Sequence, residues 1–203
     1  MPCRRSVPVT DRKTIDAYTT RVAEYLSVPL PPEQVEARMA FAEAVAPGGY
    51  VLDLGSGPGA DSMFFLREGL RVRALDATPA FVEHARENGV DAHVGTFDDV
   101  TETATFDGIY ASFSLLHAPR KDFPRHLAAI HRALKPESIF FLGLKLGTGE
   151  HRDDIDRYYT YFSQTEIEEA LAEAGFTIDR ITTGVGKGLA GSYDGFILVI
   201  AHA

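Results

Sequence analysis

A run of three alternate glycines after a short apolar segment most constrains what this chain can fold into. Residues 50–54 have the pattern of a short buried strand, and Gly55, Gly57 and Gly59 follow it directly. Because glycine leaves the backbone bare, a ligand can lie against main-chain N–H groups where the next helix begins. A tight strand-to-helix turn alone needs fewer glycines. The pattern therefore indicates a ligand site between a strand and a helix.

Strands and helices alternate along the chain on both sides of this loop, which predicts a parallel sheet covered on both faces. The last two strands are joined by a glycine-rich stretch, 184–191, without a helix, which predicts an antiparallel pair. The fold class is therefore α/β: a Rossmann-like, doubly wound, seven-stranded sheet, mostly parallel, with a C-terminal antiparallel strand pair and N-terminal helices. The expected strands are 50–54, 71–76, 91–95, 106–111, 138–145, 176–183 and 193–201, and the expected helices are 11–26, 33–46, 60–68, 78–88, 122–134 and 165–174.

The 203 residues correspond to about one domain, at roughly 150 residues per domain. We expect a single domain over 1–203 with its core at 45–203. Residues 1–32 precede this core as a helix with an apolar stripe and a proline-containing hinge at 28–32. Such an arrangement is typical of a segment that can close as a lid.

Charge and composition argue against several classes of function. The 29 acidic and 20 basic side chains give a net charge of −9, which disfavours nucleic-acid and membrane-surface partners. The one cysteine, Cys3, allows neither a disulfide framework nor a cysteine-rich zinc site, and it fits a cytoplasmic location. The seven histidines are scattered, so no metal site is expected. No run approaches about 18 apolar residues, so no membrane-spanning segment is expected.

Asp76 narrows the choice of ligand. It ends the second strand, where a carboxylate can accept hydrogen bonds from both hydroxyls of a ribose. A local role, capping the helix that begins at Thr78, is the alternative. Gly55, Gly57 and Ala60 also satisfy the dinucleotide fingerprint of nicotinamide-dependent oxidoreductases. The sequence lacks the Tyr-x-x-x-Lys pair that would accompany hydride transfer.

Five segments, taken in order, resemble the class I S-adenosylmethionine-dependent methyltransferases. The segments are 51–59 (VLDLGSGPG), 74–78 (ALDAT), 95–98 (GTFD), 106–112 (FDGIYAS) and 132–136 (RALKP). The resemblance covers about residues 45–200, the C-terminal strand pair included. One departure is Lys135-Pro136-Glu137-Ser138 in place of the family's Lys-Pro-Gly-Gly, a change confined to a surface turn.

The resemblance implies S-adenosylmethionine as cofactor and S-adenosylhomocysteine as product. Two of the positions have alternatives: Phe97 as a core residue, and Asp98, next to another acid, as part of a solvated turn. The cofactor positions carried over are Asp53, Gly55, Ser56, Gly57 and Gly59 for the methionine part, Asp76 for the ribose, Ala77, Phe97 and Asp98 for the adenine, and Ser112 near the sulfonium.

Residues that handle the acceptor are expected beyond the ends of the fourth and fifth strands, where open α/β sheets bind ligands. His117 could take a proton near neutral pH, or order its loop instead. Lys145 ends the fifth strand, so its ammonium group should point into the crevice. Residues 145–162 are rich in tyrosine and charge, which indicates a site for an oxyanion or polar molecule, with a solvated helix as the alternative. The candidate substrate-binding residues are Arg152, Arg157, Tyr158 and Tyr159.

Residues 145–162, together with two shorter segments, resemble the small bacterial methyltransferases related to tellurite-resistance proteins (type 11/12-like). The shorter segments are 16–18 (DAY) and 162–166 (FSQTE). In that subgroup the N-terminal helix tends to close over the cofactor, which implies that Tyr18 covers the methyl donor and is a third catalytic candidate beside His117 and Lys145. Plain packing is the alternative for this tyrosine. The subgroup often has arginine where this chain has Ala60, so the substrate need not be the same.

Together these patterns predict a cytoplasmic S-adenosylmethionine-dependent methyltransferase that acts on a small anionic or phenolic molecule by in-line displacement. No nucleic-acid or membrane partner is expected, and the oligomeric state is left open. A non-catalytic module that senses the cofactor or its product is the alternative from another class. An NAD-dependent oxidoreductase is the alternative enzyme.

Overall fold

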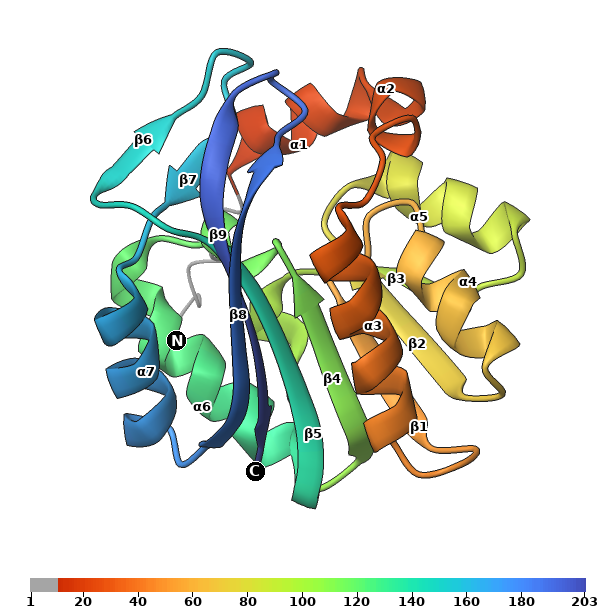
Figure 1. Ribbon diagram of the computed structural model, residues 1–203. Helices are drawn as coiled ribbons and strands as arrows, with labels where there is room; N and C mark the ends of the chain where they lie inside the picture. Colours follow the sequence, from red (N-terminus) through yellow and green to blue (C-terminus); the bar gives the residue numbers. More distant parts are fainter. Residues whose placement is uncertain (1–10) are drawn as a thin grey trace, which may run out of the picture.

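Seven strands form one sheet in the computed structural model of the chain, which describes residues 11–203 (Figure 1). Along the sheet the order is β3-β2-β1-β4-β5-β9-β8. The first five strands are parallel, whereas β9 runs antiparallel to both β5 and β8. The expected fold class is therefore confirmed. The strands are β1 (Tyr50–Leu54), β2 (Arg71–Asp76), β3 (Ala92–Val94), β4 (Phe106–Ser112), β5 (Leu134–Lys145), β8 (Thr177–Lys187) and β9 (Tyr193–His202).

The strand order reverses at β1, which pairs with β2 on one side and with β4 on the other. Sheets of this kind bind ligands in the crevice at the carboxyl ends of the strands, at the point of reversal. Val51, Leu52 and Leu54 are almost fully buried, so β1 is a rigid support for the loop that follows it. The sheet thereby brings the glycine loop and the ends of β2 and β4 to one crevice.

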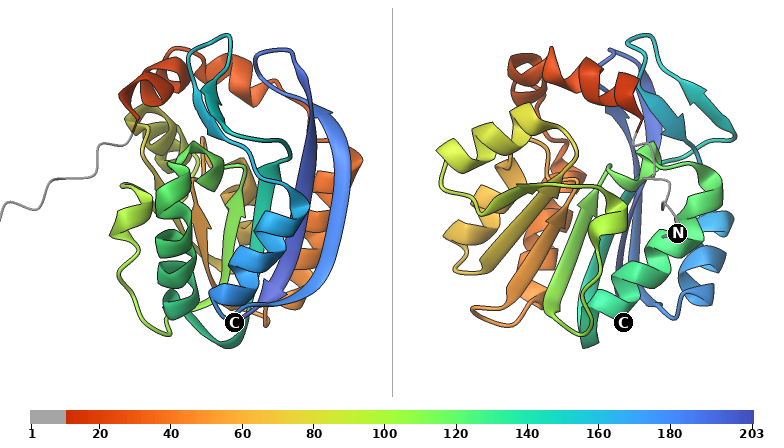
Figure 2. Two further views of the ribbon diagram at one scale, coloured as in Figure 1. Left: turned by 90° about the vertical axis from the view of Figure 1, so that its left-hand side faces the viewer. Right: turned by 180° about the vertical axis from the view of Figure 1, so that it is seen from behind.

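Helices cover both faces of the sheet (Figure 2). On one face, Phe41 and Phe65 pack against Tyr110, with ring centroids 5.1 and 5.0 Å apart. On the other face, Leu127 and Leu171 belong to the largest buried apolar cluster. The helices of the first face are α3 (Pro32–Ala44), α4 (Ala60–Arg67) and α5 (Pro79–Glu87), and those of the second are α6 (Phe123–Ala133) and α7 (Gln164–Glu173).

Two short helices and a hairpin lie across the carboxyl edge of the sheet, where the crevice opens (Figure 1). In addition, one 3₁₀ turn follows β3 and two follow β4. These elements are α1 (Arg12–Thr19), α2 (Val22–Leu26), the hairpin of β6 (Glu150–Arg152) and β7 (Tyr158–Thr160), η1 (Phe97–Asp99), η2 (Leu115–His117) and η3 (Arg120–Asp122).

The single helix expected at 11–26 is wrong, because the segment forms two helices, α1 and α2. The hydroxyl of Thr20 donates hydrogen bonds to carbonyl oxygens one turn back, both at 3.1 Å, and Arg21 leaves the helical conformation at φ −129° and ψ 27°. A threonine that bonds backwards in this way competes with helical hydrogen bonding. The break turns the Tyr18 and Tyr25 rings toward each other, at a centroid distance of 5.7 Å.

A later alternative and a later strand boundary also differ from the structure. Residues 145–162 contain the hairpin rather than a solvated helix, and β8 continues into the glycine-rich stretch as far as Lys187. Gly184 has no side chain, so the ring of Phe196 can pack directly over this position of the strand. A Cβ at Gly184 would be 2.4 Å from Phe196 Cζ.

Within residues 11–203, no helix is both long and apolar enough to cross a membrane. Over the same residues, no group of three or more His, Cys, Asp or Glu side chains is arranged to hold a metal ion. Cys3 lies outside the described residues.

Candidate functional site

A cavity of about 840 Å³ lies at the carboxyl edge of the sheet. Pockets for small molecules and cofactors have volumes of roughly 300–1,000 Å³. Tyr18 and Tyr25 cover it together with Phe81 of α5, whose ring centroid is 5.5 and 5.2 Å from theirs. The expected cofactor residues that line this cavity are Gly55, Gly57, Asp76, Ala77, Phe97, Asp98 and Ser112.

The glycine loop has a backbone that only glycine adopts easily. Gly55 and Gly57 have φ values of +73° and +54°, in the left-handed region. A Cβ on Gly55 would lie 2.2 Å from Cβ of Ser114, so the loop has no room for a side chain there. The N–H groups of Gly55 and Ser56 donate to the carbonyl oxygen of Leu75, at 2.7 and 3.2 Å. The loop is therefore clamped to β2, the strand that ends in Asp76.

Asp76 combines the two roles that the sequence left open. Its Oδ1 accepts a hydrogen bond from the Thr78 N–H at 2.7 Å, and its Oδ2 accepts one from the Gly57 N–H at 2.8 Å. The carboxylate also lines the cavity, although the residue is only 9% exposed. Burial raises the pKa of Asp76, and the two backbone hydrogen bonds oppose this effect. Each carboxylate oxygen has two acceptor positions, so both oxygens retain capacity for a ligand hydroxyl.

At the far end of the cavity, Asp98 forms an ion pair with Arg125 of α6, and its Oδ1 is 3.7 Å from His126 Nδ1. His126 is 5% exposed and packs edge-on against Phe97, at a centroid distance of 5.4 Å. Its Nδ1 is buried and has no hydrogen-bond partner among the described residues. A buried polar atom of this kind at a cavity wall is typical of a site that a ligand completes.

Asp53, expected to contact the methionine part, lies instead behind the glycine loop. It is 2% exposed, and its Oδ2 accepts a hydrogen bond from the Ser62 hydroxyl of α4 at 2.6 Å. Burial, with the nearby charge of Asp61, raises the pKa of Asp53 to about 8. Gly59 likewise faces away, since a Cβ there would be 2.9 Å from Cβ of Ala85. Both residues shape the loop from behind.

Tyr18, Tyr25 and Phe81 form an aromatic roof over the first cavity. Through the Tyr18 hydroxyl, His117 and Arg157 join this roof in one hydrogen-bonded network. His117 Nδ1 is 2.6 Å from the Tyr158 carbonyl oxygen, which can only accept, so Nδ1 carries the proton of the neutral ring. Nε2 then accepts from the Tyr18 hydroxyl at 2.8 Å, and that hydroxyl accepts from Arg157 Nη1 at 3.0 Å. Burial lowers the pKa of His117 to about 4, so this ring does not titrate near neutral pH as the sequence suggested.

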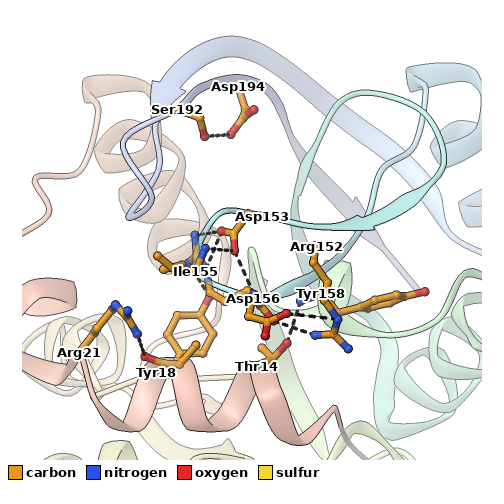
Figure 3. A network of polar contacts seen from close by, with 12 residues as sticks. Thr14, Tyr18, Arg21, Arg152, Asp153, Ile155, Asp156, Tyr158, Ser192 and Asp194 are labelled. Carbon is orange, nitrogen blue, oxygen red and sulfur yellow. Dashed lines mark hydrogen bonds and ion pairs between the residues drawn. The ribbon is translucent and has the colours of Figure 1, made fainter.

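The hairpin fastens α1 over the cavity (Figure 3). Arg152 donates from Nη2 and Nη1 to the two carboxylate oxygens of Asp11, at 2.7 and 2.9 Å. The Tyr158 N–H donates to the Thr14 hydroxyl at 2.8 Å. Arg157 is 3% exposed and donates from Nε and Nη2 to Asp153 Oδ2, at 2.9 and 2.7 Å. These arginines are therefore partly or fully committed to protein carboxylates.

A second cavity, of about 220 Å³, lies on the other side of the tyrosine roof. Lys145 lines it at the end of β5, and its Nζ donates to Asp194 Oδ2 at 2.7 Å. The ammonium group also lies 4.4 Å from the centroid of the buried Tyr159 ring. Tyr18, Tyr25 and Phe113 line both cavities, which therefore adjoin along these side chains.

The expected site residues thus fall into three groups. Besides the cofactor candidates, the first cavity is lined by Tyr18, His117, Arg152 and Tyr158; the second by Tyr18, Ser56, Lys145, Arg157 and Tyr159; and Asp53 and Gly59 lie behind the loop. Tyr25 could have been found, since it shares an apolar stripe with Tyr18. No local signal indicates His126 or Asp194, because the packing of α6 and the β5–β9 register bring them to the cavities.

Residues 51–137 match the protein family described as "Methyltransferase domain". Among curated relatives, a ubiquinone biosynthesis O-methyltransferase of Xanthomonas oryzae is 35% identical over 103 residues, which is 47% of this chain and 42% of that protein. An uncharacterized methyltransferase of Synechocystis is 31% identical over 102 residues, 49% of this chain and 48% of that protein. The matches therefore span less than half the length of these relatives.

Solved structures share the fold over most of the chain. The 1,6-didemethyltoxoflavin-N1-methyltransferase of Burkholderia thailandensis, with bound 1,6-didemethyltoxoflavin and S-adenosylhomocysteine, has a TM-score of 0.76 and 23% identity, over 94% of this chain and 87% of that one. An S-adenosylmethionine-dependent methyltransferase of Methanosarcina mazei has a TM-score of 0.72 and 17% identity, over 86% and 98%. The [4+2]-cyclase SpnF has a TM-score of 0.69 and 18% identity, over 92% of each. At these identities the likeness establishes the fold.

Proposed function

We propose that this chain, whose residues 51–137 match the methyltransferase-domain family and whose fold is shared with S-adenosylmethionine-dependent methyltransferases, transfers a methyl group from S-adenosylmethionine to a small molecule. The observation that carries the proposal is the convergence of the glycine loop, Asp76 and Asp98 on one cavity of about 840 Å³. These three features match the parts of S-adenosylmethionine in order. The glycine loop suits the methionine part, the Asp76 carboxylate suits the ribose, and Asp98 suits the adenine.

Each part of the cofactor has residues suited to hold it. Gly55, Gly57 and Ser112 would hold the methionine part, and the Asp76 carboxylate would accept hydrogen bonds from the ribose hydroxyls. The residues that would hold the adenine are Ala77, Phe97 and Asp98, and the unpartnered Nδ1 of His126 is a fourth candidate. When bound, the cofactor would supply an electrophilic methyl group: the acceptor atom would bond to the methyl carbon as the carbon–sulfur bond breaks, the bonding pair would stay on sulfur, and the acceptor proton would pass to solvent.

The chain's own residues would exclude water and align the acceptor. Burial raises the pKa of Tyr18, so its hydroxyl keeps the proton that it donates to His117. With both ring nitrogens engaged, His117 fixes the tyrosine that covers the cavity. In-line displacement depends mainly on alignment, so a covered, dry site can supply much of the acceleration without a strong base.

The segment of α1 and α2 would act as a lid over the cavity. Its contacts with the hairpin include polar ones at the surface, such as the Asp11–Arg152 pair, and the proline-containing connector at 28–32 follows it. A roof of this kind must open for the cofactor to enter and its product to leave.

The activities of two similar proteins support a small acceptor, since one is an O-methyltransferase of ubiquinone biosynthesis and the other is a methyltransferase bound to 1,6-didemethyltoxoflavin. A cyclase shares the fold as well, so a role without methyl transfer is the second candidate that a test must address.

The test is transfer of labelled methyl from S-adenosylmethionine into a pool of small metabolites, separated from protein and nucleic acid after the reaction. We expect label in the small-molecule fraction, and its loss in Asp76→Ala. Asp91→Ala removes an exposed carboxylate elsewhere and should leave the transfer intact. Binding of S-adenosylhomocysteine without transfer into any fraction would contradict the proposal and favour a non-methylating role.

A further inference from the structure

The second cavity adjoins the glycine loop from the side opposite to the first. Ser56 and Pro58 of that loop line it, and so does Phe113, which follows β4. Tyr18, Tyr25 and Phe113 are common to both cavities, so the two spaces meet at this aromatic wall. A molecule in the second cavity would therefore lie next to the loop that is proposed to hold the methionine part of the cofactor.

The walls of the second cavity are mostly apolar and aromatic. Phe113 and Phe196 meet edge to face, at a centroid distance of 6.1 Å, and Leu30 of the connector lies at the rim. With a volume of about 220 Å³, the space suits one small ring better than a drug-sized ligand. Flat apolar surfaces of this kind favour a planar aromatic guest.

Lys145 supplies a cation at the base of this apolar space. Its side chain is 12% exposed, and its Nζ is held by Asp194 at 2.7 Å and by the Tyr159 ring. Burial alone would raise the pKa of Asp194, but the hydrogen bond and charge of Lys145, together with the Ser192 hydroxyl, outweigh it and lower the pKa. The ammonium group has three donors, so donors remain after the one that Asp194 engages.

Lys145, Arg157 and the exposed Lys187 line the cavity, and Lys145 is the lysine among them that is mostly buried. The Nε and Nη2 of Arg157 donate to Asp153, and its Nη1 donates to Tyr18. Asp153 thus occupies the Nε–Nη2 edge of the guanidinium, so a carboxylate would not find that bidentate edge free. Lys145 acts as a point charge, which matches an anion centred on a single atom.

We infer that the second cavity binds the methyl acceptor, and that the acceptor is a planar aromatic molecule with one acidic hydroxyl whose ionised oxygen lies against Lys145. This inference rests on the proposed function for the methylation of that oxygen. The binding of the ionised oxygen against Lys145 does not depend on the proposed function. The hydroxyl proton passes to solvent on ionisation, and the O–H electron pair stays on oxygen, where Lys145 stabilises it. Lys145 is then a substrate-binding residue that favours the nucleophilic form.

The test uses para-nitrophenol, because its phenolate absorbs visible light and reports ionisation directly. The probe is titrated with the protein alone and with the protein saturated by S-adenosylhomocysteine. We expect the bound probe to have a pKa lower by about one unit than the free probe, as an adjacent cation produces. Lys145→Met should remove this shift and weaken probe binding about tenfold, and Lys145→Arg should restore both.

The matched control is Lys135→Met, on the same strand, because Lys135 pairs with Asp107 at the same 2.7 Å distance but at the opposite end of the sheet. It should leave the probe shift unchanged. A second variant, Leu30→Trp, fills the rim without touching Lys145 and should abolish probe binding while S-adenosylhomocysteine still binds.

An unshifted probe, the same shift in Lys145→Met, or displacement of S-adenosylhomocysteine by the probe would each overturn the inference. Failure of S-adenosylhomocysteine to bind, with a Lys145-dependent probe shift intact, would instead overturn the proposed function and leave the acceptor site standing.

Discussion

Gly55 is the residue at which the loop has least freedom. It combines a φ of +73° with a neighbour, Ser114, that a Cβ would meet at 2.2 Å. Gly69, at the end of α4, has a similar φ of +81° but open space around it. The two glycines therefore separate the cost of a left-handed backbone from the cost of a clash in the site.

We expect Gly69→Ala to lower the free energy of unfolding by about 1 kcal/mol, the usual cost of a left-handed alanine. Gly55→Ala should cost several kcal/mol and also abolish S-adenosylhomocysteine binding, because the loop must move away from Ser114. Urea unfolding and calorimetric titration measure the two effects. Equal costs in both variants would show that the close packing of the loop is not needed.

Asp53 gives the stability a distinctive pH dependence. Its pKa is about 8 in the folded chain, because of burial and the charge of Asp61, and about 3.9 when unfolded. Between these values the folded state holds a proton that the unfolded state has lost, so stability falls as pH rises. His117, with its pKa lowered to about 4, acts in the opposite sense, but only below about pH 6.5.

We therefore expect the stability of the native chain to fall between about pH 6.5 and 8, by at most about 1.4 kcal/mol per pH unit. Asp53→Asn keeps an acceptor for Ser62 but has no proton to lose, so its decline over this range should be smaller. Asp91→Asn, at an exposed site, should retain the native slope. Thermal unfolding across the pH range measures all three, and identical slopes would argue against a protonated Asp53.

At the scale of elements, the roof depends on a contact between segments far apart in the sequence. The hairpin meets α1 through Asp11–Arg152, Lys13–Asp156 and the Thr14 hydroxyl. The hydrogen bond from Arg152 lowers the pKa of Asp11 to about 2, so this pair stays ionised throughout the neutral range. Its strength should respond to salt rather than to pH.

Arg152→Met should let the roof open more often. We expect S-adenosylhomocysteine to dissociate roughly two- to fivefold faster, the order of effect of a well-aligned surface ion pair, and high salt should reduce the difference. Stopped-flow displacement measures the rate. Arg71→Met, at the opposite end of the sheet, is the control. An unchanged rate in Arg152→Met would mean that the hairpin does not hold the lid.

Element boundaries show where sequence patterns stop being sufficient. The alternation of strands and helices is local, so the seven-stranded α/β sheet could be predicted in full. The break at Thr20 and the extension of β8 past Gly184 could not, because each depends on a specific contact. The helix alternative for 145–162 failed for a similar reason: tyrosines that pack on η2 favour the strand.

For the molecule as a whole, topology explains which site residues were predictable. Residues at the carboxyl ends of β1, β2 and β4 meet wherever this sheet forms, so Gly55, Asp76 and Ser112 line one cavity as expected. Asp53 lies within β1 rather than after it, and α4 covers its carboxylate. The partners of Arg152 and Lys145, Asp11 and Asp194, depend on contacts across the fold that no local pattern contains.

The most direct test of the account is thermal unfolding with S-adenosylhomocysteine, S-adenosylmethionine or NAD added in turn. A ligand at 100 times its dissociation constant stabilises by about 2.7 kcal/mol, which raises the midpoint by roughly 5–10 °C for a chain of this size. We predict this shift with the two sulfur compounds, none with NAD, and none in Asp76→Ala, while Asp91→Ala keeps it. A shift with NAD alone, or an unchanged shift in Asp76→Ala, would contradict the assignment of the cavity.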